Sequence, residues 1–173
     1  MLRNELIFLR ALEADDLDFL YNLENDAALW GVSDTLAPVS RHLLRQYLDH
    51  AATDFHEVKQ MRLVICAVPD GRPVGTLDLF DFNPLHQRAG LGITVLAMER
   101  RRGYAAAALQ LSLNYAEQTL RLHQLYCTVE ISNTASQALF QAAGFRQVGV
   151  RQQWLRTAAG WQDAVEWQCI LAG

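Results

Sequence analysis

The chain lacks the features of a membrane-spanning or exported protein. No run of about eighteen apolar residues occurs, and no early segment combines a basic start, an apolar core and a cleavage site. Cysteine is scarce: Cys66, Cys127 and Cys169 each lie within an apolar stretch, and no pair has the spacing of metal ligands. We therefore expect a cytosolic protein with buried reduced thiols and no bound metal or membrane.

Lysine is also scarce. Lys59 is the only lysine, and the formal net charge is −4 at pH 7. Such a chain is a poor partner for nucleic acid as a whole, although a local basic site is compatible with it. The length of 173 residues, with 51% hydrophobic and 20% charged residues, is typical of a globular protein. These totals predict one folded domain over residues 1–173 that does not bind nucleic acid.

Hydrophobic periodicity and turn residues predict a mixed α/β fold. Strands are expected at 5–11, 61–68, 74–82, 89–96, 124–130, 147–156 and 161–171. Helices are expected at 17–24 after an acidic start, at about 41–48 after Ser40, at 104–120, and from about 134 to a C-cap at Gly144. The expected order is β-α-α-β-β-β-α-β-α-β-β.

An arginine run ending in glycine lies where a predicted strand passes into the helix at 104–120. Arg100, Arg101 and Arg102 precede Gly103 and a run of alanines. Free N–H groups and the helix dipole favour an anion there. The lysine and hydroxyl residue of a Walker A loop and the extra glycines of a dinucleotide fingerprint are absent. From these residues alone, an anion site and a solvated basic run are equally good readings.

Two segments resemble the GNAT N-acetyltransferase superfamily. Arg100-x-x-Gly103-x-Ala105 is similar to its Gln/Arg-x-x-Gly-x-Gly/Ala motif, and residues 133–145 are similar to its Asn-x-x-Ser/Ala-x-x-Leu-Tyr-x-x-x-Gly-Phe segment. Residues 9–17 and 160–163 resemble the ends of the spermidine and ribosomal-protein acetyltransferase branch. The resemblance implies a central, mostly antiparallel sheet of about seven strands, flanked by helices, in which a splayed parallel pair holds CoA.

The same resemblance implies that acetyl-CoA is the co-substrate. Its pantetheine would lie between the strands at 89–96 and 124–130, and the Val95 N–H would hold the thioester carbonyl. The cofactor contacts that the resemblance implies are Val95, Arg100, Arg101, Arg102, Gly103, Tyr104, Ala105, Ala106, Asn133, Ser136 and Phe140.

The position of the family's usual general acid, a tyrosine, is occupied here by Phe140. A phenyl ring cannot donate a proton, so another group or water would protonate the leaving thiolate. A free thiol has a pKa of about 8.5, so at neutral pH the thiolate can leave without a proton at little cost in free energy. Reduced activity, or a non-catalytic acyl-CoA-binding module, is the alternative.

Carboxylates on strands are the candidate general bases. Asp81 ranks first because it aligns with an acidic residue that the polyamine branch uses, and Glu130 closes the strand beside the expected acetyl group. Asp78 interrupts an apolar run, where a buried carboxylate needs a partner. His86 could relay a proton. A structural ion pair or a solvated strand end remains the alternative for each carboxylate.

The segment 25–39 and the second helix, at about 41–48, are expected to select the acceptor. Trp30 and Asp34 could bind a cationic amine, together with Asp78 and Asp81. The predicted function is transfer of the acetyl group to a primary amine, polyamine-like, by direct attack in a ternary complex. A protein N-terminus is the alternative acceptor. A homo-oligomer is compatible with the resemblance, because the polyamine branch often assembles.

Overall fold

The computed structural model describes residues 2–27, 29–30, 37–50, 55–157 and 159–171. The strands are β1 (Ile7–Ala11), β2 (Met61–Ala67), β3 (Pro73–Asn83), β4 (Arg88–Val95), β5 (Gln124–Glu130), β6 (Arg146–Thr157) and β7 (Gly160–Ile170). The α-helices are α1 (Leu17–Glu24), α2 (Arg41–His50), α3 (Phe55–Val58), α4 (Tyr104–Gln118) and α5 (Thr134–Ala142), and the short 3-10 helices are η1 (Ala14–Asp16) and η2 (Ala97–Glu99).

The strands form one seven-stranded sheet in the order β1-β2-β3-β4-β5-β7-β6. Every neighbouring pair is antiparallel except β4 and β5, which are parallel. The long helix α4 connects those two strands, as a parallel pair requires. The predicted mixed α/β fold with a mostly antiparallel sheet and one parallel pair is confirmed.

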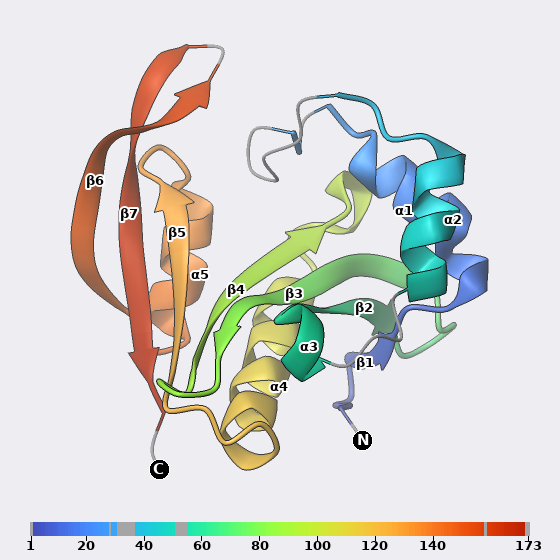
Figure 1. The fold of residues 1–173 in the computed structure, drawn as a ribbon, viewed down its shortest axis with the longest axis horizontal. Coiled ribbons are helices and arrows are strands. Elements are labelled where there is room, and N and C mark those ends of the chain that lie inside the picture. Colours follow the sequence, from blue (N-terminus) through green and yellow to red (C-terminus); the bar gives the residue numbers. More distant parts are fainter. Residues whose placement is uncertain (1, 28, 31–36, 51–54, 158, 172–173) are drawn as a thin grey trace.

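The parallel pair is short. β4 and β5 are paired only where residues 88–90 meet residues 124–126. Beyond these residues the two strands diverge, and Figure 1 shows β4 turning toward α1 while β5 continues beside β7. The sheet therefore opens between residues 91–95 of β4 and 127–130 of β5.

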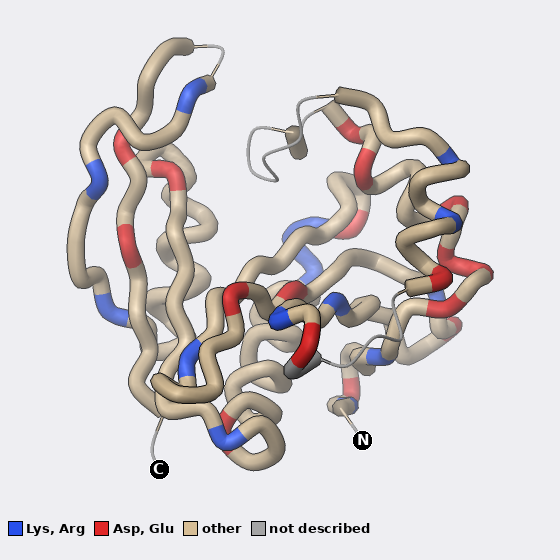
Figure 2. The backbone as a smooth tube through the Cα atoms, viewed as in Figure 1, with Lys and Arg blue, Asp and Glu red and all other residues tan. Residues whose placement is uncertain are grey.

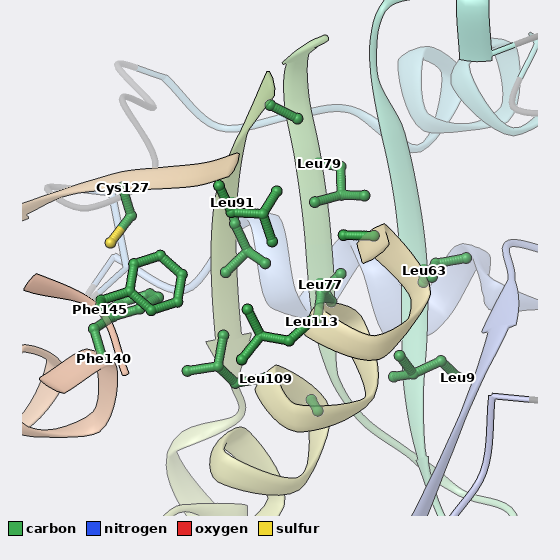
Figure 3. Packing of buried hydrophobic residues seen from close by; sticks show 14 of the residues in the cluster. Leu9, Leu63, Leu77, Leu79, Leu91, Leu109, Leu113, Cys127, Phe140 and Phe145 are labelled. Carbon is green, nitrogen blue, oxygen red and sulfur yellow. The ribbon is translucent and has the colours of Figure 1, made fainter. Parts of the chain in front are cut away.

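Helix α4 packs against the sheet through small and branched residues. Ala108 and Leu109 are fully buried, and Leu113 points toward Leu77 of β3 (Figure 3). Burying a leucine side chain stabilises the fold by about 1.5–3 kcal/mol, so this layer holds α4 in place. The start of α4, at Tyr104, is therefore held in a fixed position relative to the sheet.

A second part of the core lies beside β5. The rings of Phe140 and Phe145 meet edge to face with centroids 5.1 Å apart, and Cys127 lies near them (Figure 3). Gly144, between the two phenylalanines, has φ of +93°, which is the left-handed conformation expected at a helix C-cap. The predicted end of α5 is confirmed.

Some details differ from the sequence prediction. The short helix α3 was not expected. In α2, Leu43 is 55% exposed, whereas Leu44 faces the core. The three cysteines are free thiols, but Cys169 is only half-buried because it lies near the end of β7, beyond the residues that pair with β6. Burial raises the pKa of Cys127 to about 12. Within the described residues, no helix is long and apolar enough to cross a membrane.

Candidate functional site

The opening between β4 and β5 exposes backbone N–H groups of β4. Leu96 N–H donates to Val74 O at 2.9 Å, so this pair is a hydrogen-bonded pair of the antiparallel β3–β4 ladder. Because such pairs alternate along a ladder, the N–H groups of Val95 and Ile93 point away from β3, toward β5. β5 is no longer paired with β4 at this level. Both N–H groups therefore face the opening.

The turn after β4 reverses the chain in a few residues. Arg101 and Gly103 both have left-handed φ, at 60° and 81°. Gly103 is the N-cap of α4 and has no capping side chain, so the N–H groups of the first helical turn are not capped from within the turn. These amides, together with the helix dipole, form an anion-binding geometry. The strand, turn and helix context predicted for this run is confirmed.

The three arginines of the turn have different surroundings. Arg100 donates through Nε to the carbonyl of Val95 at 3.1 Å, which ties the turn to the end of β4. Arg102 forms an ion pair with Glu99, with Nη1 and Oε2 3.2 Å apart. Arg101 is exposed, and within the described residues it has no ion pair. The run is therefore only partly a free cationic patch.

Tyr104, Ala105 and Ala106 follow in the first turn of α4. The Tyr104 side chain is 7% exposed and belongs to the core, so only its backbone N–H faces the turn. Ala105 is half-buried and Ala106 is exposed. Their small side chains leave the helix N-terminus accessible to a bulky anion.

Helix α5 lies along the β5 side of the opening. Asn133 caps it, because its Oδ1 accepts a hydrogen bond from the Ser136 N–H at 3.1 Å. Phe140 is 4% exposed and packs on Phe145, so its ring is part of the core. Asn133 thus orients the helix whose Ser136 and Phe140 were predicted to contact the cofactor.

Glu130 and Asp81 lie at opposite ends of the opening. Glu130 ends β5 and accepts a hydrogen bond from the Ser132 hydroxyl at 2.5 Å. Asp81 lies in the bulge between Phe80 and Asn83, beside the paired start of β4. Five residues of strand separate Gly90 from Val95, which at about 3.3 Å per residue places Asp81 roughly 16 Å from the Val95 amide. Asp81 and Val95 are not brought together at one point.

Asp81 has an aromatic neighbour that sequence reasoning missed. The Tyr126 hydroxyl lies 3.5 Å from Asp81 Oδ2, and the Tyr126 ring meets Phe80 edge to face. Burial, and then the negative charge of Asp81, raise the pKa of Tyr126. Asp81 itself has φ of 50°, an uncommon conformation for a residue with a side chain. In the sequence, only the alternation of side chains along β5 between the two faces of the sheet could have predicted the face on which Tyr126 lies.

Asp78 is held in a network of buried charges. Arg62 of β2 donates through Nε to Asp78 Oδ1 at 2.6 Å and through Nη1 to Glu24 Oε1 at 2.5 Å. Tyr47 of α2 lies over the guanidinium of Arg62, 5.9 Å from the ring centroid. Burial raises the pKa of Asp78, and the charge of Arg62 opposes that rise. The structure thus gives Asp78 the ion-pair partner that its apolar setting required.

These residues share one face of the sheet, which we call the α1 face: Arg62, Thr76, Asp78 and Thr94, covered by α1 and α2. The register pairs Arg62 with Asp78 and Thr76 with Thr94. A small pocket opens on this face, lined by Leu23, Glu24, Leu29, Arg62, Thr76 and Thr94. The pocket reaches the residue that precedes Val95, so it adjoins the opening between β4 and β5.

Of the predicted acceptor residues that the structure describes, Trp30, Asp78 and Asp81 do not line this pocket. Trp30 donates through Nε1 to the carbonyl of Glu24 at 2.9 Å, which anchors the segment after α1. Asp34 lies outside the described residues. His86 is exposed, and its backbone N–H is bound by Asn83 Oδ1 at 2.9 Å. Glu24, which the sequence did not single out, is the acidic residue that does reach the pocket.

Charges of both signs are interspersed along the chain, with a positive cluster where β4 passes into α4 (Figure 2). No group of three or more His, Cys, Asp or Glu side chains within the described residues could hold a metal ion. The groups that could bind an anion are therefore the backbone amides and arginines of the turn. The groups that could bind a cationic amine are the carboxylates near the α1 face.

Known proteins resemble this chain in sequence and in fold. Residues 7–146 match the family model for the acetyltransferase (GNAT) domain. The spermidine N(1)-acetyltransferase of Escherichia coli is 28% identical over 144 residues, covering 82% of this chain and 73% of the relative. A crystal structure of the Vibrio cholerae spermidine N-acetyltransferase with CoA and spermine is 25% identical, covers 97% of each chain and has a TM-score of 0.86.

A dodecameric structure of the same Vibrio cholerae enzyme in an intermediate state is 24% identical to this chain. It covers 97% of this chain and 95% of the other, with a TM-score of 0.82. The likeness shows that the two chains share a fold.

Proposed function

The chain belongs to the GNAT acetyltransferase family, and on that premise we propose that it moves the acetyl group of acetyl-CoA to a primary amine of a polyamine such as spermidine. Members of this family use acetyl-CoA, and the Vibrio cholerae relative binds CoA and spermine. The observation that carries the proposal is the opening between β4 and β5, because it begins at the anion-binding turn and adjoins a pocket that Glu24 lines.

We propose that acetyl-CoA lies along this opening. The diphosphate would bind the amides at 101–106, and the pantetheine would pass between 91–95 of β4 and 127–130 of β5. The Val95 N–H, which faces the opening, would donate to the thioester carbonyl. A fixed N–H stabilises the oxyanion that develops there, because no dipole has to reorient during the reaction. Asn133 would act by orienting α5.

We propose that the acceptor amine approaches from the α1 face. Glu24 and Asp78 carry two negative charges and Arg62 one positive charge, so the network has a net charge of −1. A network with a net negative charge beside the pocket attracts a protonated amine. Asp81, about 16 Å from the Val95 amide along the strand, suits a second, distant amine of an elongated acceptor better than the reacting amine.

The reaction proposed is direct attack in a ternary complex. The amine must lose a proton before its nitrogen attacks the carbonyl carbon, because an alkylamine has a pKa of about 10.4. Glu130, the last residue of β5, would accept that proton directly or through water. The C–N bond forms, the C–S bond breaks, and the thiolate leaves. Phe140 cannot protonate the thiolate, so water does.

We also propose that the chain self-associates through β6. This strand lies at the edge of the sheet, and Val148, Val150 and Trp154 on it are 59%, 46% and 53% exposed. A long edge strand with apolar side chains is a surface that proteins usually cover. The dodecamer of the Vibrio cholerae relative supports this part of the proposal. Size-exclusion chromatography with light scattering tests it, and a monomer at micromolar concentration contradicts it.

The function is tested by following release of free thiol from acetyl-CoA with spermidine, a simple monoamine and a peptide with a free N-terminus. The proposal expects turnover with spermidine and little with the peptide. Turnover with the peptide alone would support a protein N-terminal acetyltransferase. Binding of acetyl-CoA without thiol release for any acceptor would support a non-catalytic acyl-CoA-binding module.

A further inference from the structure

Glu99 is a buried carboxylate that joins two turns of the chain. It ends η2 and is 8% exposed. Its Oε1 accepts from Arg72 Nε at 3.2 Å and its Oε2 from Arg72 Nη2 at 3.1 Å. Arg102 Nη1 lies 3.2 Å from the same Oε2. One carboxylate therefore links the arginine turn after β4 to the turn between β2 and β3.

The turn between β2 and β3 is a fixed anchor for this link. Gly71 N–H donates to Ala67 O at 2.9 Å, and Ala67 N–H donates to Arg72 O at 3.0 Å. The Arg72 guanidinium also donates through Nη1 to Asp70 Oδ2 at 2.6 Å. With three of its N–H groups bound to two carboxylates, Arg72 has one defined orientation. A planar guanidinium that binds a carboxylate through two parallel hydrogen bonds also fixes its partner's geometry.

The arginine turn needs such an anchor because Arg101 has φ of 60°. A residue with a side chain is disfavoured in the left-handed region and remains there only when its surroundings hold it. On one side, Arg100 is tied to the Val95 carbonyl. On the other side, Arg102 is tied to Glu99. Arg101 thus lies between two fixed neighbours.

We infer that Glu99 is a positioning residue for the acetyl-CoA site: held by Arg72 and bound to Arg102, it keeps the arginine turn in its anion-binding conformation. The inference rests on the proposed function. It divides the arginines by role, because Arg100 and Arg102 are engaged within the protein and Arg101 is the one whose guanidinium is available to the diphosphate. Glu99 itself does not touch the cofactor.

A purely electrostatic view makes the opposite prediction. The hydrogen bonds from Arg72 lower the pKa of Glu99, so the carboxylate is ionised at neutral pH. A negative charge near a diphosphate site repels the ligand. If charge alone mattered, Glu99→Gln would remove that repulsion, free Arg102 and lower the KM for acetyl-CoA. A positioning role predicts that the KM rises.

The test is steady-state kinetics of Glu99→Gln with acetyl-CoA and the acceptor varied in turn. The KM for acetyl-CoA should rise by about tenfold, since a buried carboxylate loses two charge-assisted partners, while kcat and the acceptor KM stay within about twofold of wild type. An unchanged or lower KM for acetyl-CoA overturns the inference.

Arg72 gives an independent variant if Glu99→Gln does not fold. Arg72→Lys keeps the charge but cannot make the two parallel hydrogen bonds, and it lies outside the cofactor turn. It should raise the same KM, and the double variant should be no worse than Glu99→Gln alone, because both changes break one link. Additive effects of the two changes contradict the link.

Asp70→Asn is the matched control. Asp70 touches the same guanidinium but its side chain is 51% exposed and does not contact the arginine turn. Its effect on the acetyl-CoA KM should stay below about twofold. Calorimetry with CoA separates the two proposals: if wild type does not bind CoA, the proposed function fails, and if wild type and Glu99→Gln bind CoA equally, only the inference about Glu99 fails.

Discussion

The arginine turn after β4 and the α1 face of the sheet are built in different ways. The turn consists of residues adjacent in the chain, and its ligands are backbone amides at a helix start. The α1 face depends on Arg62, which joins Glu24 and Asp78 across 38 and 16 positions of sequence. The first region takes its shape from local backbone chemistry, whereas the second depends on the tertiary fold.

This difference separates the roles of the two regions. A backbone amide site tolerates changes of side chain but not of backbone conformation, so Gly103 should be its most sensitive position. The α1 face consists of buried side-chain charges, so it should be sensitive to loss of a single charge. We therefore expect substitutions in the two regions to alter cofactor binding and acceptor choice separately.

The largest expected effect is at the turn. Gly103→Asp should weaken CoA binding by more than about a hundredfold, because a carboxylate a few ångströms from a diphosphate costs several kcal/mol. The new side chain would also be strained, since Gly103 has φ of +81° and an added Cβ would meet Leu6 at 3.4 Å. Isothermal titration with CoA measures the change.

Gly144→Asp is the matched control for that substitution. Gly144 also has positive φ, at +93°, and an added Cβ there meets no heavy atom within 4 Å. The same backbone strain is thus introduced away from the diphosphate. CoA affinity should stay within about threefold of wild type, while the free energy of unfolding falls by about 1 kcal/mol. Equal loss of CoA binding in both variants would show that the turn is not part of the cofactor site.

The α1 face should respond through stability. Arg62→Met leaves Glu24 and Asp78 without their cation, and the three side chains are only 21%, 18% and 16% exposed. The free energy of unfolding should fall by about 3 kcal/mol, the cost of breaking a buried ion pair from one side. Urea unfolding at pH 7 measures the change.

Arg41→Met provides the comparison for Arg62. Arg41 of α2 pairs with Asp18 of α1, but these side chains are 45% and 79% exposed. Solvent screens such a pair, so the loss should stay below about 1 kcal/mol. If the two variants were equally destabilised, the ion pairs of the α1 face would contribute no more to the free energy of unfolding than an exposed ion pair does.

The two carboxylates at the ends of the opening should differ in kind. Glu130→Gln should lower kcat by about a hundredfold, as expected for loss of a general base. Asp81→Asn should raise the polyamine KM and change kcat little. Steady-state kinetics over pH 6–9 distinguish them, and the reverse pattern would make Asp81 the base.

The smallest expected effect is at Phe140. Restoring the family's tyrosine with Phe140→Tyr should change kcat by less than about threefold, because a thiol of pKa about 8.5 leaves readily without an acid. Phe140 is 4% exposed and packs on Phe145. A buried hydroxyl without a partner should therefore lower the free energy of unfolding by about 1 kcal/mol. A large rise in kcat would show that proton donation limits turnover.

Most of the fold could be predicted because its signals are local. The strand at 124–130 has the bounds expected, and α5 begins and ends where its Asn133 cap and Gly144 indicate. The arginine turn could be predicted for the same reason, since a strand, a glycine and a helix start lie within a few residues of one another.

Contacts between distant segments could not be predicted in this way. Nothing near Asp78 in sequence indicates Arg62 as its partner, because the pairing follows from the register of β2 on β3. The position of Tyr126 beside Asp81 likewise depends on where β5 leaves β4. The contribution of Glu24 to the pocket follows from the packing of α1.

The proposed position of acetyl-CoA is best tested by a crystal structure of the chain with CoA. We expect diphosphate oxygens within hydrogen-bonding distance of the amides at 101–106, and pantetheine between 91–95 of β4 and 127–130 of β5, with the Val95 N–H nearest the thiol end. CoA bound elsewhere, or a diphosphate held without those amides, would contradict it.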